Sequence, residues 1–172
     1  MSGIRAVVVD PDAPNRLALA DVEEPSPTPS EVLVRVSAVS LNRGEVRRAG
    51  SSEPGFRPGW DLAGTVERAA ADGSGPQEGS RVVGFLPSGA WAELAAVPTD
   101  SVAFLADGVS FEEASTLPVA GLTALYALEE GETCSEGTSW LRAPRAGPDS
   151  SRCSSPGRQG RGWSGSCAGR SM

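Results

Sequence analysis

Short runs of β-branched residues recur along the first hundred positions of the chain and predict β-strands. Residues 4–9 read IRAVVV, and residues 32–39 read VLVRVSAV. In the second run, valines at every other position alternate with Leu33, Arg35 and Ser37. This alternation predicts a half-buried strand whose valines face inward and whose other side chains face outward.

Further strands are expected on both sides of this run. Residues 59–68, 80–85 and 90–98 are mostly apolar and are separated by glycine-rich turns. Residues 17–31 contain a short strand followed by three prolines, which mark a connection because proline has no N–H to donate to a sheet. Regular short strands between such turns are typical of a closed or nearly closed β-barrel.

Helical patterns occur in two parts of the chain. Residues 41–50 have mixed polarity and end in a glycine, which fits one or two helical turns. Later, Ser110 and Glu113 have the spacing of a capping box and predict a helix start, and Pro118 interrupts the helix. The pattern resumes over residues 119–130, where four apolar side chains lie near one face: Leu122, Leu125, Tyr126 and Leu128.

The C-terminal segment has a different composition, because residues 142–172 contain no Val, Ile, Leu or Phe. Without bulky apolar side chains such a segment cannot offset the entropy lost on ordering, so we expect it to be disordered. Its abundance of Arg, Gly, Ser and Pro also suggests the hypothesis that it is translated out of frame. Sequencing the gene around codons 129–150 would test this, and a genuinely disordered tail is the alternative.

The distribution of charged residues also differs between the body of the chain and its C-terminal segment. Residues 1–141 contain nine Arg and 21 Asp or Glu, whereas residues 142–172 contain six Arg and one Asp. The acidic body lacks the clustered cations that bind phosphate, so we expect no nucleic-acid partner. The chain starts without a signal-peptide pattern, and its longest apolar run has 12 residues, fewer than the roughly 20 that span a bilayer. We therefore expect a cytoplasmic protein with no membrane partner.

Several segments, in this order and spacing, resemble the medium-chain dehydrogenase/reductase superfamily, and in particular its zinc-free quinone oxidoreductases. They are EVLVRVSAVSLNRGEVRRAG, RPGWDLAGTV, GSRVVGF, GAWAELAAVP and LPVAGLTALYAL. The resemblance implies that residues 1–128 form a mainly β, GroES-like catalytic barrel with a few short helices. In the family a Rossmann domain that binds NADPH follows. We find no strand and glycine-rich turn of that kind after Leu128, so we predict that the Rossmann domain is absent and that residues 129–172 are a linker and tail.

The resemblance also indicates where zinc ligands would lie if this chain had them. Zinc-containing members of the superfamily place a cysteine near Ser40 to Asn42 and a histidine near Trp60. This chain has no histidine, and its cysteines lie elsewhere without metal-binding spacing, at Cys134, Cys153 and Cys167. We therefore expect no zinc. Zinc-free relatives reduce quinones or enones with hydride from NADPH, which implies a small quinone or enone as substrate. The protein must then position the partners and donate a hydrogen bond to the developing oxyanion.

Four residues are candidates for the site. By resemblance, Asn42 is catalytic and contacts the cofactor, and Thr123 approaches the nicotinamide ribose or carboxamide. Trp60 and Asp61 could shape a substrate pocket. Each residue has a structural alternative: a helix cap for Asn42, a buried helix hydroxyl for Thr123, core packing for Trp60 and a turn anchor for Asp61.

Two functions remain open from the sequence. The first is an NADPH-dependent, zinc-free reductase of quinones or enones, of which this chain holds the substrate half, so that NADPH binding by the chain itself is in doubt. The second is a noncatalytic GroES-like barrel fragment or binding module. Without a partner lobe, the apolar face of residues 119–130 would stay exposed, so we also expect homo-association through that face.

Overall fold

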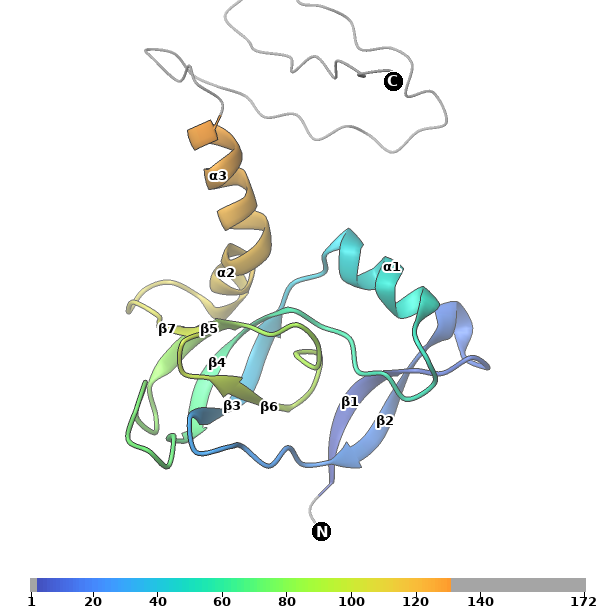
Figure 1. The fold of residues 1–172 in the computed structure, drawn as a ribbon, viewed down its shortest axis with the longest axis horizontal. Coiled ribbons are helices and arrows are strands. Elements are labelled where there is room, and N and C mark those ends of the chain that lie inside the picture. The colour runs from blue at the N-terminus through green and yellow to red at the C-terminus, as the bar shows by residue number, and fades with distance from the viewer. Residues whose placement is uncertain (1–2, 131–172) are drawn as a thin grey trace, which may run out of the picture. The chain divides into compact units, whose positions relative to one another are not determined.

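The computed structural model describes residues 3–130, and their strands form two antiparallel sheets (Figure 1). One sheet pairs β1 with β2, and the other has five strands in the order β6-β3-β4-β5-β7. The strands are β1 (Gly3–Val9), β2 (Leu17–Glu23), β3 (Glu31–Val39), β4 (Asp61–Arg68), β5 (Arg81–Phe85), β6 (Leu94–Pro98) and β7 (Val102–Phe104). The helices are η1 (Pro14–Arg16), α1 (Arg43–Ser51), α2 (Phe111–Ser115), η2 (Leu117–Gly121) and α3 (Leu122–Glu130). The predicted fold class, mainly β with a few short helices, is confirmed for this part of the chain.

The predicted strands and helices are present, with shifts at their ends. The strand expected from residue 59 begins at Asp61, and the strand expected from residue 90 begins at Leu94. One strand was not expected, because β7 has only three residues and two of them are exposed. Such a short edge strand is stabilised by its pairing with β5 rather than by a hydrophobic pattern of its own.

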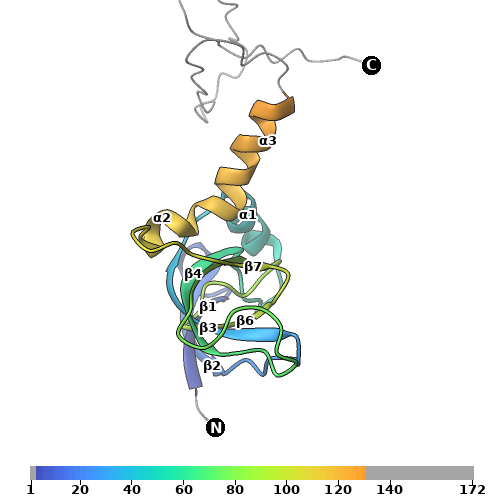
Figure 2. The same cartoon turned by 90° about the vertical axis from the view of Figure 1, so that its left-hand side faces the viewer.

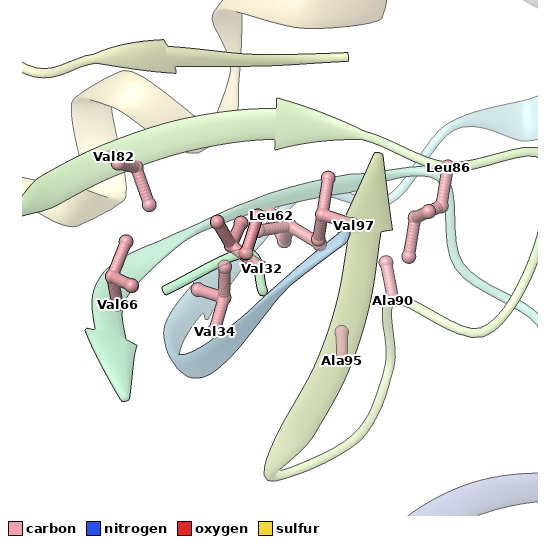
Figure 3. Close-up of a cluster of buried hydrophobic side chains, with 10 residues drawn as sticks. Val32, Val34, Leu62, Val66, Val82, Leu86, Ala90, Ala95 and Val97 are labelled. Carbon is pink, nitrogen blue, oxygen red and sulfur yellow. The ribbon is translucent and has the colours of Figure 1, made fainter. Parts of the chain in front are cut away.

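The main hydrophobic core is built from side chains of β3, β4, β5 and β6 and of the loop between β5 and β6 (Figure 3). Alternate residues of β3 and β4 supply much of it, because successive side chains of a strand point to opposite faces. The labelled members are Val32, Val34, Leu62, Val66, Val82, Leu86, Ala90, Ala95 and Val97. The inward direction predicted for Val32 and Val34 is therefore confirmed.

The other face of β3 is also buried at its start, which alternation did not predict. Leu33 was expected to face outward, yet it is 1% exposed and packs with Ile4 and Leu94 in a second cluster. Ile4 belongs to β1, so the β1–β2 hairpin covers the face that alternation left open to solvent. Further along β3, Arg35 and Ser37 are exposed as predicted.

The β1–β2 hairpin is joined to the five-stranded sheet beside β6. The Val7 N–H donates to the Trp91 carbonyl at 2.8 Å, and the Glu93 N–H donates to the Arg5 carbonyl at 3.0 Å. The Arg5 and Glu93 side chains form an exposed ion pair at 3.1 Å across the same junction. The hairpin thus extends the curled sheet toward a barrel, while β6 and β7 remain its edge strands (Figure 1).

The helical segment after β7 begins and breaks where the sequence predicts. The Ser110 hydroxyl accepts from the Glu113 N–H at 3.1 Å, and the Glu113 carboxylate accepts from the Ser110 N–H at 3.0 Å, which confirms the capping box. The helix that follows, α2, packs against β3 and β4 (Figure 2). At Pro118, which has no N–H to continue an α-helix, the chain forms a wider turn closed by the Gly121 N–H and the Thr116 carbonyl at 3.1 Å.

Replacing Ser110 by Ala is expected to lower the free energy of unfolding by about 1 kcal/mol, because the Glu113 N–H loses its acceptor. Urea denaturation measures the loss. Ser110→Asn is the matched control, since it keeps a side-chain oxygen at the cap and should stay close to the wild-type value. Equal losses in the two variants would contradict the capping role.

The predicted tail, residues 142–172, and its out-of-frame origin lie outside the described residues. The boundaries proposed for the domain, 1–128, and for the linker and tail, 129–172, stay predictions. Within residues 3–130, no helix combines the length and apolar character needed to cross a bilayer.

Candidate functional site

Asn42 lies between β3 and α1, at the N-cap position of α1. Its backbone N–H donates to Glu45 Oε1 at 2.5 Å, and its Nδ2 donates to the same oxygen at 3.1 Å. The three-residue spacing is that of a capping box, in which the glutamate turns back to the start of the helix. The helix-cap role of Asn42 is therefore confirmed, and its side chain is half-buried.

Asp61 is the first residue of β4 and is fully buried. Its Oδ2 accepts from the Ser40 hydroxyl at 2.5 Å and from Asn42 Nδ2 at 2.7 Å. The antiparallel pairing of β3 with β4, which places Val39 opposite Leu62, brings these groups together. None of residues 3–130 donates to Asp61 Oδ1. Asp61 thus anchors the segment from Ser40 to Asn42, and its burial keeps its own carboxylate from direct contact with solvent.

Trp60 is half-buried and its ring lies against α1. Its backbone N–H donates to Glu45 Oε2 at 2.7 Å, and a Cβ added at Gly44 would lie 2.7 Å from the ring. The glycine at position 44 is therefore what permits the indole to approach the helix. The preceding Gly59 has a φ of +110° and lets the chain pass close to the Trp91 backbone.

The carboxyl group of Glu45 connects the start of α1 to the segment before β4, because it accepts hydrogen bonds from the backbone N–H groups of Asn42 and Trp60. Glu45 is only 1% exposed. Burial raises the pKa of this carboxyl above its ordinary value of 4.5. The N–H donors of Asn42 and Trp60 act against the shift, and the nearby carboxylate of Asp61 adds to it. Ionising Glu45 is therefore harder in the folded protein than in the unfolded chain.

The raised pKa of Glu45 predicts a pH-dependent contribution to stability. Because the folded state holds this proton more tightly, the contribution is full below pH 4.5 and is lost as the pH rises through the raised pKa. We expect the free energy of unfolding of the wild type, relative to Glu45→Gln, to fall over that interval. Urea denaturation of both proteins from about pH 4 to about pH 8 measures the difference.

The comparison with Glu45→Gln removes the effect of other groups. Hydrogen bonds from Arg35 and Arg5 lower the pKa values of the exposed carboxylates of Glu67 and Glu93, whose contributions are lost as the pH falls. These contributions are the same in both proteins and cancel. A difference that stayed constant or rose with pH would contradict the direction of the Glu45 shift.

A groove of about 700 Å³ lies next to the segment that carries the polar cluster of Ser40, Asn42, Glu45 and Asp61, but none of these four residues lines it, and neither does Trp60. Leu41, the residue between Ser40 and Asn42, lines it and is 74% exposed. Trp91 also lines it, and its indole N–H donates to the Ser40 carbonyl at 3.3 Å. Most of the remaining wall is apolar, with Val7, Leu17, Leu19, Val36 and Val39. The two charged residues of the wall, Arg5 and Glu93, neutralise each other, so the groove suits an uncharged, apolar molecule.

Thr123 lies on α3 and its side chain is exposed, so it is not the buried hydroxyl of the structural alternative. Within the described residues no hydrogen bond joins it to the cluster of Ser40, Asn42, Glu45 and Asp61. On the same helix, Leu122 and Leu125 are 47% and 48% exposed, as predicted for that apolar face. Homo-association through this face stays a prediction.

The residue types in the described part of the chain suit the nicotinamide and ribose of a dinucleotide cofactor better than its diphosphate. Asn42 and Thr123 offer an amide and a hydroxyl of the kind that hold a nicotinamide or a ribose. A diphosphate is usually held by the free N–H groups at a helix N-terminus. In residues 3–130, the N-termini of α1 and α2 are closed by the carboxylates of Glu45 and Glu113, which disfavour an anion. These residues therefore do not fit the diphosphate.

Metal ligands do not gather in the described part either. Within residues 3–130, no three His, Cys, Asp or Glu side chains come close enough together to hold a metal ion. The positions near which zinc-containing relatives place their ligands hold Ser40, Asn42 and Trp60, which form the polar cluster with Glu45 and Asp61 instead.

Sequence reasoning missed two contributors to the site. Glu45 follows Asn42 by three residues, and this capping-box spacing could have identified it. The groove had no signal in the sequence, because its walls come from β1, β2, β3 and the segment around Trp91.

The fold is that of a GroES-like domain, and residues 28–107 match the family described as the alcohol dehydrogenase GroES-like domain. The chain belongs to the medium-chain dehydrogenase/reductase superfamily and is similar there to quinone oxidoreductase-like proteins. A trans-enoyl reductase of Aspergillus terreus is 34% identical over 71% of this chain and 45% of its own length.

Two solved structures show the same likeness. The quinone oxidoreductase of Thermus thermophilus, whose complex with NADPH has been solved, is 33% identical with a TM-score of 0.64, over 78% of this chain and 43% of that one. The human synaptic vesicle membrane protein VAT-1 homolog-like protein is 30% identical with a TM-score of 0.72, over 80% and 47%. The chain thus spans less than half the length of each of these relatives.

Proposed function

We propose that this domain is the substrate-binding half of an NADPH-dependent, zinc-free reductase of quinones or enones. The observation that supports it most directly is a mainly apolar groove, whose two charged residues pair with each other, next to the segment that holds Asn42. A quinone or an enone is itself uncharged and largely apolar, so it matches that groove. The relatives named as quinone oxidoreductase and trans-enoyl reductase point to the same two substrate classes.

The residues of the site have separate roles in this proposal. Asn42 contacts the reacting groups, and Trp60, which packs against α1 and does not line the groove, would bound the substrate pocket from the side of that helix. Asp61 is a positioning residue, since it is fully buried and holds Asn42 and Ser40. Thr123 contacts the nicotinamide ribose or carboxamide. Bound NADPH would supply the hydride, and its diphosphate would need residues other than those in 3–130.

A noncatalytic GroES-like binding module is the second candidate. The observation that favours it is the closure of the N-termini of α1 and α2 by Glu45 and Glu113, which leaves no place for a diphosphate there. In that case the apolar groove would bind its ligand without any redox step.

Titrating NADPH into the chain separates the two candidates. If the chain binds NADPH, tryptophan fluorescence should be quenched and the melting temperature should rise, because a ligand that binds only the folded state stabilises it. The rise should be smaller in Asn42→Ala than in the control Asn15→Ala, which changes an exposed asparagine. No change in either signal at millimolar NADPH would favour the binding module.

A further inference from the structure

The side-chain amide of Asn42 is surrounded by hydrogen-bond acceptors. Its Nδ2 lies 2.7 Å from Asp61 Oδ2 and 3.1 Å from Glu45 Oε1, and the Ser40 hydroxyl oxygen lies 3.3 Å away. The Ser40 hydroxyl donates its own proton to Asp61 Oδ2 at 2.5 Å, so it too can only accept from Asn42. Two amide protons thus face three oxygen atoms.

The opposite orientation of the amide is unfavourable. Rotating the side chain by half a turn would place Asn42 Oδ1 against the oxygens of Asp61 and Glu45, where acceptors face an acceptor. Both carboxylates are at least 99% buried, so water does not relieve that contact, and a buried group without its partner is costly. The orientation of Asn42 is therefore fixed by its neighbours.

We infer that Asp61 and Glu45 hold the NH2 group of Asn42 inward, so that Asn42 offers a ligand only its oxygen, as a hydrogen-bond acceptor. The oxygen lies toward the Glu45 N–H at the start of α1 and keeps a second lone pair. The matching ligand group is a donor, such as a carboxamide N–H or a hydroxyl. A quinone or enone oxygen, which can only accept, must take its hydrogen bond from another group.

This inference rests on the proposed function in one respect, the choice of Asn42 as the contact residue. It implies that the hydrogen bond to a developing oxyanion, which the sequence assigned to no residue, comes from a group other than Asn42. Asp61 and Glu45 act through Asn42, so they are positioning residues.

Nuclear magnetic resonance of the side-chain amides tests the orientation without any ligand. The chain has two asparagines and two glutamines, so four NH2 pairs are expected, and the pair missing in Asn42→Ser identifies Asn42. Its protons should exchange with water about five-fold or more slowly than those of exposed Asn15, the factor expected from one hydrogen bond. They should also show a nuclear Overhauser contact to the β-protons of Ser40. Exchange as fast as that of Asn15, with no such contact, would overturn the inference.

Two variants of Asp61 separate orientation from general stability. Asp61→Ala removes the acceptor and should speed the exchange of the Asn42 NH2 group. Asp61→Asn keeps an oxygen at the same place and should restore slow exchange. If both variants exchanged equally fast while melting like the wild type, the acceptor at position 61 would not be what orients Asn42.

A matched pair of small probes tests the donor preference. Nicotinamide carries a carboxamide NH2 group, and 3-acetylpyridine has a methyl group in its place. Nicotinamide should shift the Asn42 signals at about five-fold lower concentration than 3-acetylpyridine, and Asp61→Ala should reduce that preference. Equal responses to both probes would overturn the donor preference. If neither probe bound while the Asn42 amide exchanged slowly, the orientation would stand and the proposed function would lose its support at this residue.

Discussion

Replacing Leu62 by Ala should lower the free energy of unfolding by about 2–5 kcal/mol. Leu62 lies on β4, has no exposed surface and belongs to the main core (Figure 3). The substitution removes its buried methyl groups and leaves a cavity, because close-packed neighbours relax only in part. Domains of this size are stable by only about 5–15 kcal/mol, so the variant is expected to lose a large fraction of its stability.

Urea denaturation followed by tryptophan fluorescence measures this loss, and Leu19→Ala is the matched control. Leu19 undergoes the same chemical change at a side chain that is 70% exposed. The control should therefore stay within about 0.5 kcal/mol of the wild type. If the two variants lost equal amounts, the hydrophobic core would not be centred on the sheet described above.

Replacing Glu45 by Ala should lower the free energy of unfolding by about 2–4 kcal/mol. The carboxylate accepts from the backbone N–H groups of Asn42 and Trp60 at 2.5 and 2.7 Å, and both donors would lose their partner. A buried donor without an acceptor costs about 1–3 kcal/mol. Removing a carboxyl whose pKa is raised by burial offsets part of that loss, which is why the expected value stays below the sum for two donors.

The effect should be visible in the indole as well as in stability. Because Trp60 is tied to α1 through Glu45, its fluorescence should shift toward that of a solvent-exposed indole in Glu45→Ala. Glu53→Ala is the control, since Glu53 is a glutamate with an exposed side chain just beyond the same helix. A loss in Glu45→Ala no larger than that in the control would show that the buried carboxylate does not hold Asn42 and Trp60 together.

Local patterns predicted the elements well because they depend on neighbouring residues. Alternation located β3, the Ser110 and Glu113 spacing located the start of α2, and Pro118 located the break before α3. The outward direction expected for Leu33 was wrong because a segment distant in the sequence packs on that face of β3. Leu33 is buried because Ile4 of β1 packs on it. The two residues are 29 positions apart, and the alternation within one strand does not reveal which distant strand will pack on it.

For the candidate site as well, the sequence identified individual residues, and the structure was needed to show which of them are in contact. The resemblance named Asn42 as catalytic, and the residue types of Trp60 and Asp61 made them candidates for a substrate pocket. Their physical relation appeared only in the structure, since Asn42 and Asp61 are 19 residues apart and meet through the pairing of β3 with β4. Thr123 was named by the same resemblance, and it lies exposed on α3 without a hydrogen bond to that cluster among the described residues.

The sequence by itself determined every strand except β7, the cap at Ser110, the family resemblance and the lack of histidine, because each of these follows from residue type and short spacing. The tertiary structure decided which carboxylates became buried, which way the Asn42 amide points and where the apolar groove lies. Those features depend on contacts between strands that are distant in the chain, and their strength comes from the exclusion of water, which no local pattern records.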